Sequence, residues 1–272
     1  MRAHWRLAAM LAVSAAALLW AVPFAWMAVA SLRPGVPTDI ASLTPTGPFA
    51  LQNFADAWAS GSFPLWYLNT VTVCGCILAV QLVTATAAGY AFARLDFPGR
   101  ELIFAMFLLQ LLLPPALLIA PNLATLASLH IYDSLAGIMA PYFSSAFGVF
   151  LMRQTFRTIP VDYEEAAMLE GASIPALICH VLVPLARPGM VAFAIVSVST
   201  HWNEFLWPLI ATSSPHNQVL TVGLASFASG SEAGSAWGIV AAGTFLVAGP
   251  LLLFFLIFQR RFASSFAFSG IK

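Results

Sequence analysis

The stretch DYEEAAMLEGASIPALICHVLVPLARP, residues 162–188, determines how the rest of the chain is interpreted. Asp162 is placed to cap a helix, and Glu165 three residues later would complete a capping box. Gly171 stands where a helix ends in a left-handed residue, and Ser173 can cap a second short helix. We therefore expect a short helix, a glycine turn and a second short helix, flanked on both sides by long apolar stretches.

The composition is typical of an integral membrane protein. Hydrophobic residues make up 60% of the 272 positions and charged residues only 8%, whereas a soluble domain carries about 25% charged residues. The mean hydropathy is +0.88. A span needs ~20 residues, so the chain has room for several spans and little else. The formal net charge of zero gives no electrostatic support for binding nucleic acid.

Six stretches are apolar and long enough to cross a lipid bilayer. We predict an all-α polytopic protein, one membrane domain over residues 1–272, with spans at about 7–32, 66–93, 102–126, 134–156, 189–212 and 235–259. Prolines interrupt the third stretch, which we interpret as one kinked span because two spans would need ~40 residues. A polar loop is expected from about 213 to 232. The first span exceeds the length of a signal-peptide core, so we expect it to be retained.

The Lys and Arg residues fix the orientation. If six spans alternate across the membrane, every Lys and Arg except Arg33 falls on the side of the N-terminus. The positive-inside rule then predicts that both termini and the loop at residues 157–188 are cytoplasmic.

The same loop resembles a known motif. It is similar to the EAA loop of ABC importer permeases, written EAA-x3-G-x9-I-x-L-P, although Val181 and Val183 replace the Ile and the Leu. The matching residues are Glu165, Ala166, Ala167, Gly171 and Pro184.

Other segments extend the resemblance from about residue 66 to the C-terminus. YAFARLDFPGR at 90–100 is similar to a turn of the carbohydrate branch of these permeases, and FLMRQ at 150–154, WNEFLWP at 202–208 and QRRF at 259–262 also fit. Together they point to the subfamily that serves maltose-type oligosaccharides and glycerol 3-phosphate. Within it, the chain resembles the shorter of two paired permeases.

The resemblance implies a type I importer fold and a permease subunit of an ATP-driven, binding-protein-dependent importer in a bacterial-type cytoplasmic (inner) membrane. It implies a second homologous but distinct permease, two cytoplasmic ATPase subunits and an extracytoplasmic solute-binding protein as partners. The first helix of the loop would be a coupling helix that docks in an ATPase. The residues expected to carry coupling are Glu164, Glu165, Ala166, Ala167, Gly171 and Pro184. The alternative is a solvated surface helix without a partner.

The sequence offers no nucleotide site or catalytic site. The only lysine is Lys272, so a P-loop, which needs a Lys between a glycine-rich turn and a helix, is excluded. ATP and Mg²⁺ would therefore be bound by partner ATPases, and no cofactor is expected here. No nucleophile–base or metal constellation is present. Cys74, Cys76 and Cys179 are expected to be small buried hydrophobic residues.

Glu204 is the only charged residue away from the ends of a predicted span, since Arg153 lies at the end of the span at 134–156, and this makes Glu204 a candidate functional residue. His201 would lie three residues earlier on the same helical face, with Asn203 adjacent. These three residues have three interpretations: a hydrogen bond between packed helices, a lining of the solute path, or a proton relay. The relay would make the chain an ion-coupled secondary transporter or channel instead. Since no Arg or Lys lies deep in a predicted span, an uncharged sugar is favoured over glycerol 3-phosphate, unless a partner supplies the charge.

Overall fold

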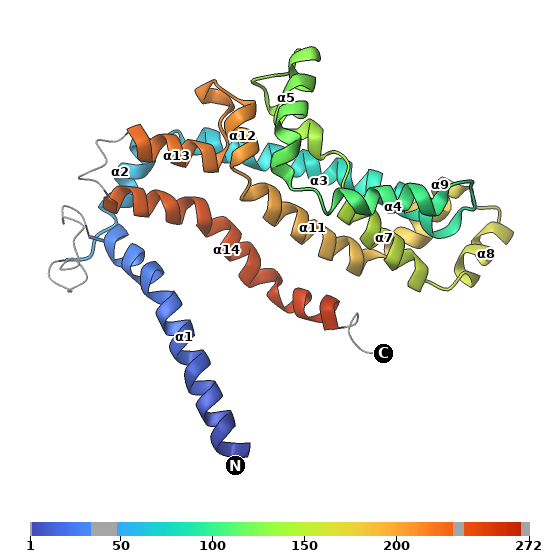
Figure 1. Cartoon of the computed structure of the whole chain (residues 1–272), viewed down its shortest axis with the longest axis horizontal. Helices are drawn as coiled ribbons and strands as arrows, with labels where there is room; N and C mark the ends of the chain where they lie inside the picture. The colour runs from blue at the N-terminus through green and yellow to red at the C-terminus, as the bar shows by residue number, and fades with distance from the viewer. Residues whose placement is uncertain (1, 34–47, 231–236, 268–272) are drawn as a thin grey trace. The chain divides into compact units, whose positions relative to one another are not determined.

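The fold is all-α in the computed structural model, which describes residues 2–33, 48–230 and 237–267. Helices are the only regular elements in these ranges (Figure 1). The chain divides into two compact units. Unit 1 comprises residues 1–64 and 222–252, and unit 2 comprises residues 65–221 and 253–272.

Unit 1 contains three complete or nearly complete helices and the ends of two more. These are α1 (Arg2–Ser31), α2 (Gln52–Ser60), most of α13 (Leu220–Gly230), the start of α3 (Phe63–Arg94) and the first half of α14 (Trp237–Ala267). The end of α1 is joined to α2 by Asn53, whose buried amide donates to the carbonyls of Ala30 and Ser31 at 3.1 Å each. This amide satisfies carbonyls that a helix C-terminus leaves without partners.

Unit 2 is built around α3. Its other elements are α4 (Arg100–Gln110), η2 (Pro115–Leu118), α5 (Ile119–Ser128), α6 (Leu135–Met139), η3 (Ala140–Tyr142), α7 (Ala146–Thr158), α8 (Asp162–Leu169), α9 (Ile174–Leu177), the π-helix η4 (Ile178–Leu182), α10 (Val183–Leu185), α11 (Arg187–Trp202), α12 (Leu206–Ala211) and η5 (Pro215–Asn217). Its core includes Tyr90, Phe104, Met152, Phe156 and Leu177.

Gly89 allows α7 to approach α3 closely. A Cβ atom at this position would lie 2.6 Å from the Cβ atom of Met152, so a larger residue would push the two helices apart. Small residues at helix contacts are a common means of close packing between membrane helices.

The apolar helices agree with six spans. Three are single helices, at Ala9–Ser31, Phe63–Arg94 and Trp237–Ile257. Three more are bent pairs: Arg100–Gln110 with Pro115–Ser128 (101°), Leu135–Tyr142 with Ala146–Thr158 (45°), and Ile174–Leu185 with Arg187–Trp202 (80°). By length and composition the described chain has up to six spans if each bent pair is one span.

Two details of the predicted spans are wrong. The span predicted at 189–212 is not a continuous helix, because α11 ends at Trp202 and α12 begins at Leu206. Pro208 provides the physical reason, since its ring would clash with the carbonyl of residue 204 in a continuous helix. Most of the loop predicted at 213–232 is the apolar helix α13; the part before Leu220 is irregular or 3₁₀, and residues 231 and 232 lie outside the described residues.

Candidate functional site

The loop at residues 157–188 has the predicted helix, turn and helix, but not the predicted caps. Gly171 is left-handed, with φ of +84°, as predicted. The capping box is wrong: Val161 is the residue before α8, its backbone is helical (φ −65°, ψ −26°), and no side chain caps the helix. An N-cap side chain needs an extended backbone to reach back to the free amides. Ser173 does precede α9 in an extended conformation, but its hydroxyl makes no capping bond.

A buried ion pair attaches α8 to the C-terminal end of α3. Glu164 is 3% exposed, and its carboxylate accepts a hydrogen bond from Nε of Arg94. A second nitrogen of Arg94 donates to the carbonyl of Ile159 at 2.7 Å. Glu164 was predicted to belong to a docking surface, whereas here it is already bound inside the chain. The sequence analysis did not identify Arg94, since nothing in the local pattern relates it to residue 164.

Several large apolar side chains of the loop are exposed. We call Val161, Tyr163, Met168, Leu169 and Ile174 the loop apolar surface; they are 48, 52, 52, 90 and 53% exposed. Of the remaining predicted coupling residues, Glu165, Ala166 and Gly171 are also exposed, while Ala167 and Pro184 are half-buried. Large apolar side chains that are exposed at several positions of one short segment are typical of a protein interaction surface.

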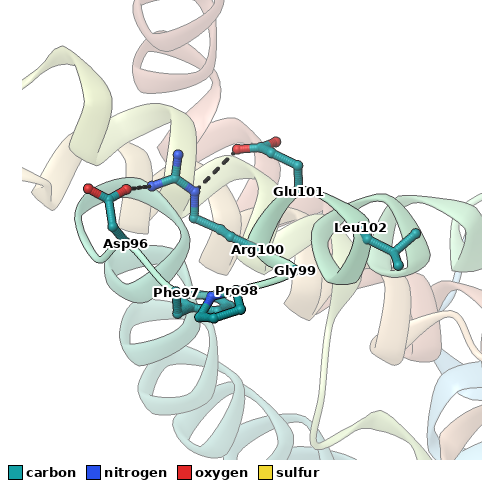
Figure 2. A pocket seen from close by; sticks show the side chains of 7 residues that line it. All are labelled: Asp96, Phe97, Pro98, Gly99, Arg100, Glu101 and Leu102. Atoms are coloured by element: carbon teal, nitrogen blue, oxygen red, sulfur yellow. Dashed lines mark hydrogen bonds and ion pairs between the residues drawn. The ribbon is translucent and has the colours of Figure 1, made fainter.

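A second arginine fixes the neighbouring turn between α3 and α4. Arg153 is 8% exposed; it donates to the carbonyl of Phe92 at 3.1 Å and to Glu101 at 2.9 Å, and its guanidinium lies 3.9 Å from the ring centroid of Phe104. Figure 2 shows the exposed side of this turn, where Arg100 lies between Asp96 and Glu101, at 2.7 and 3.3 Å. The open hollow beside them, of about 560 Å³, is lined by residues 96–102. Arg94 and Arg153 therefore hold this end of unit 2 in a defined geometry.

Toward the other end of α3, two adjoining hollows form what we call the polar groove. They measure about 170 and 260 Å³ and share Gln110, Tyr142 and Ser144. Asn122, Glu204 and Trp207 line the first hollow, and Gln81, Ser197 and His201 line the second. Within unit 2, Figure 1 places α12 near the N-terminal half of α3 and α8 beyond its C-terminal end.

The groove is bordered by three interruptions of helices. Leu113 comes from the break between α4 and η2, Ser144 from the break between η3 and α7, and Glu204 from the break between α11 and α12. Irregular backbone at membrane depth is tolerated where it is buried in protein or lines a water-filled cavity. In this chain all three breaks lie beside the polar groove.

Gln81 organises the inner wall of the groove. Its amide donates to the carbonyl of Tyr142 at 2.7 Å and lies 3.3 Å from Nε2 of His201, while its carbonyl accepts from the Ser197 hydroxyl at 2.6 Å. The rings of Tyr142 and His201 are 4.6 Å apart between centroids. His201 is thus held in place by its neighbours, although its Nδ1 atom has no hydrogen-bond partner among the described residues.

The three residues predicted for a substrate path are not equivalent. Glu204 and His201 line the hollows, but Asn203 is not among the lining residues; its amide donates to the carbonyl of Ser199 at 2.8 Å, at the end of α11. The only hydrogen bond to the Glu204 carboxylate in the described chain is a long one of 3.4 Å from the Trp207 amide. His201 and Glu204 share no direct hydrogen bond in the same part of the chain, although both line one small hollow of about 10 Å³.

The sequence analysis missed three polar residues of the groove. The side chains of Gln110, Asn122 and Ser144 make no hydrogen bond to any described residue. Each is an isolated polar residue in an apolar stretch, and this was the available signal. Metal binding has no support in residues 2–33, 48–230 and 237–267, where no three His, Cys, Asp or Glu side chains are grouped to hold an ion.

Comparison with known proteins gives one family. Residues 82–267 match the sequence model of the binding-protein-dependent transport system inner membrane component. The diacetylchitobiose uptake system permease protein NgcG of Streptomyces coelicolor is 31% identical over 254 residues, which cover 91% of this chain and 84% of the relative.

Two further relatives and one solved structure also resemble the chain. The trehalose transport system permease protein SugB of Mycobacterium tuberculosis is 29% identical, over 92% of each chain. The sn-glycerol-3-phosphate transport system permease protein UgpE of Yersinia pestis is 31% identical, over 79% of each chain. A chain from the crystal structure of a bacterial ABC transporter involved in the import of alginate superposes with a TM-score of 0.83 at 19% identity, covering 94% of this chain and 95% of its own. The structural likeness shows that the two chains share a fold.

Proposed function

The chain belongs to the family of binding-protein-dependent transport system inner membrane components, and from this premise we propose that it is a permease subunit that carries a sugar or a related solute into the cell. The names of the relatives support this solute class, since they include permeases for diacetylchitobiose, trehalose and sn-glycerol 3-phosphate. ATP would drive the transport.

Three kinds of partner protein are proposed: ATPase subunits, a second permease and a solute-binding protein. Lys272 is its only lysine, so a P-loop is excluded and ATP with Mg²⁺ would be bound by two partner ATPase subunits. A second, homologous permease would complete the pathway, and an extracytoplasmic binding protein would deliver the solute. The chain itself would have no enzymatic activity. With every Lys and Arg except Arg33 on one side, the termini and the 157–188 loop would be cytoplasmic.

The loop at residues 157–188 would couple ATP hydrolysis by the partner subunits to transport. The observation that carries this proposal is the loop apolar surface, in which Leu169 is 90% exposed, on a helix fixed to α3 by the Arg94–Glu164 ion pair. An exposed apolar surface binds a partner, and a rigid attachment transmits the partner's displacement. Closure of the ATPases on ATP would therefore move α8, and α8 would move the spans between inward-open and outward-open arrangements.

Substitution in the loop tests the proposal. Leu169→Asp would place a charge in the proposed interface and remove about 1.5–3 kcal/mol of apolar burial. We expect at least a tenfold loss of affinity for the ATPase subunits and a parallel loss of ATP-driven uptake. Thr158→Asp is the control, because it adds the same charge at an exposed position before α8.

Co-purification of the tagged permease with its ATPases and solute uptake in proteoliposomes provide the measurements. If Leu169→Asp retains both while α8 stays folded, coupling does not pass through the loop apolar surface. Uptake by the chain alone, without any ATPase, would contradict the proposal as a whole.

A further inference from the structure

We infer that the polar groove is a solute-contacting surface that accepts uncharged saccharides and rejects phosphate esters. Gln110, Asn122 and Ser144 would bind hydroxyl groups, and Glu204 would supply the charge that repels anions. The inference rests on the proposed function only in treating the chain as a permease. It chooses among the solute classes of the relatives, of which one is a glycerol phosphate.

The first observation is the hydrogen-bonding capacity that the groove leaves unused. The side chains of Gln110, Asn122 and Ser144 have no partner within the described chain. Gln110 and Ser144 are exposed and Asn122 is half-buried, so their donors and acceptors are available to water or to a solute in the groove. Two amides and a hydroxyl provide both donors and acceptors, which suits the hydroxyl groups of a sugar.

The second observation is the apolar floor of the groove. Trp207 and Tyr142 line the first hollow beside these polar groups. Trp207 is 4% exposed, and its indole nitrogen donates to the carbonyl of Ile138 at 3.1 Å. Its ring is therefore fixed, and a rigid aromatic surface next to a few polar groups is the usual composition of a small-molecule site.

The third observation is the negative charge of the groove lining. Glu204 lines the first hollow, and neither hollow has an Arg or Lys among its lining residues. A phosphate group in the groove would meet a carboxylate with no cation to compensate it. A neutral solute can instead donate its hydroxyls to that carboxylate, whose only bond to the described chain is the long one from Trp207.

The size of the groove is that of a small-molecule site. Its two hollows, of about 170 and 260 Å³, share lining residues, and together they fall within the ~300–1,000 Å³ of a typical ligand pocket. A facing surface of the second permease would close the groove on its open side.

Thiol chemistry tests the charge without knowledge of the solute. Asn122→Cys would be made in a chain carrying Cys74→Ala, Cys76→Ser and Cys179→Ser, within the assembled importer. Its rates of reaction with a trimethylammonium and a sulfonate methanethiosulfonate reagent would be compared with those of Ser128→Cys, an exposed position on the same helix outside the groove. Ser144→Cys repeats the measurement if Asn122→Cys fails to assemble.

We expect the ratio of cationic to anionic reaction rates to be about tenfold higher in the groove than at Ser128→Cys, which corresponds to ~1.4 kcal/mol of charge–charge interaction. Adding Glu204→Gln should abolish most of this difference. Equal ratios at the two positions would overturn the charge selection. A groove cysteine that reacts in the isolated chain but in no nucleotide state of the importer would show that the groove is packed against the partner permease and never open to solute, which also overturns the inference.

Protection by solutes distinguishes the classes directly. Trehalose or diacetylchitobiose should slow modification of the groove cysteine during ATP-driven turnover with the binding protein, and sn-glycerol 3-phosphate should not. Protection by the phosphate ester alone would reverse the proposed selectivity. The ratios of cationic to anionic reaction rates do not depend on whether the 157–188 loop docks an ATPase, because they are measured without ATP, whereas protection by solutes requires turnover. Failure of the inference is therefore separable from failure of the proposed coupling.

Discussion

Removing the Glu164 carboxylate should release α8 from α3 while leaving the membrane helices intact. In Glu164→Ala the guanidinium of Arg94, whose side chain is 13% exposed, loses its only ion-pair partner in the described chain. Breaking one side of a buried ion pair costs about 3–5 kcal/mol. The carbonyl of Ile159 still accepts from Arg94, so we expect the lower end of this range.

Hydrogen exchange followed by mass spectrometry measures the effect locally. Since 1.4 kcal/mol corresponds to a factor of ten, amides of α8 should exchange roughly 10²–10³-fold faster, whereas amides in the middle of α7 should not change. Glu165→Ala is the matched control: this adjacent glutamate is exposed and forms no ion pair in the described chain. Its exchange should remain within about threefold of the wild type, as for surface substitutions of ~0.5 kcal/mol.

The pair can also be replaced as a unit. Arg94→Met combined with Glu164→Leu removes both charges, and a buried pair replaced by apolar residues of similar volume is often neutral or stabilising. The double variant should therefore exchange more slowly than Glu164→Ala. Equal protection of α8 in wild type and Glu164→Ala, or equal loss in Glu164→Ala and Glu165→Ala, would refute the role assigned to the ion pair.

Three further outcomes are expected. Gly171→Ala should destabilise the turn after α8 by about 1–2 kcal/mol, because φ at this position is +84°, although no atom lies within 4 Å of the added methyl group. Hydrogen exchange of the α8 amides measures this destabilisation, and an unchanged exchange rate would contradict the prediction. Gly89→Leu should lower the melting temperature, at a cost of about 1–3 kcal/mol of overpacking, while Gly75→Leu, where a Cβ meets nothing within 4 Å, should not. Hydrogen bonds from the Ser214 hydroxyl and the Ser214 and Ser213 amides hold the pKa of Asp133 well below its usual range. The stability that the ionised Asp133 carboxylate gives the fold is therefore complete above about pH 4 and is lost as pH falls through the lowered pKa. The melting temperatures of wild type and Asp133→Asn should converge below about pH 4, and a constant difference would contradict this.

The long helices were predictable because their signal is local and uninterrupted. The apolar stretch at 66–93 lies within α3, and the stretch at 7–32 extends one residue beyond the end of α1. The breaks were less accessible, although Pro208 contained the information: a proline disfavours helix at the position four residues earlier, which is Glu204. The sequence analysis gave hydropathy priority over this proline and extended one helix from 189 to 212. It missed α13 for the opposite reason, since it extended the polar character of residues 213–218 over an apolar segment.

The sites were predictable only in part, because their contacts join distant segments. The left-handed backbone of Gly171 was predicted from the residue types that end helices, and it is confirmed. The partner of Glu164 is 70 residues away, at the end of another helix, and no spacing rule relates two such positions. Gln110, Asn122 and Ser144 meet only because three helices are interrupted at the same place, and a polar residue in an apolar stretch does not reveal which face of its helix is buried.

The loop and the groove are connected through α3. Arg94 holds α8 at the C-terminal end of this helix, and Gln81 holds Tyr142 and His201 at the groove; at ~1.5 Å per residue the two positions are about 20 Å apart along the axis. An intact helix is stiff over this distance, so under the proposed coupling a displacement of α8 would be transmitted to Gln81. The helices across the groove are interrupted at Leu113, Ser144 and Glu204, where they would bend. A stiff helix on one wall and broken helices on the other would let the loop change the width of the groove without unfolding any span.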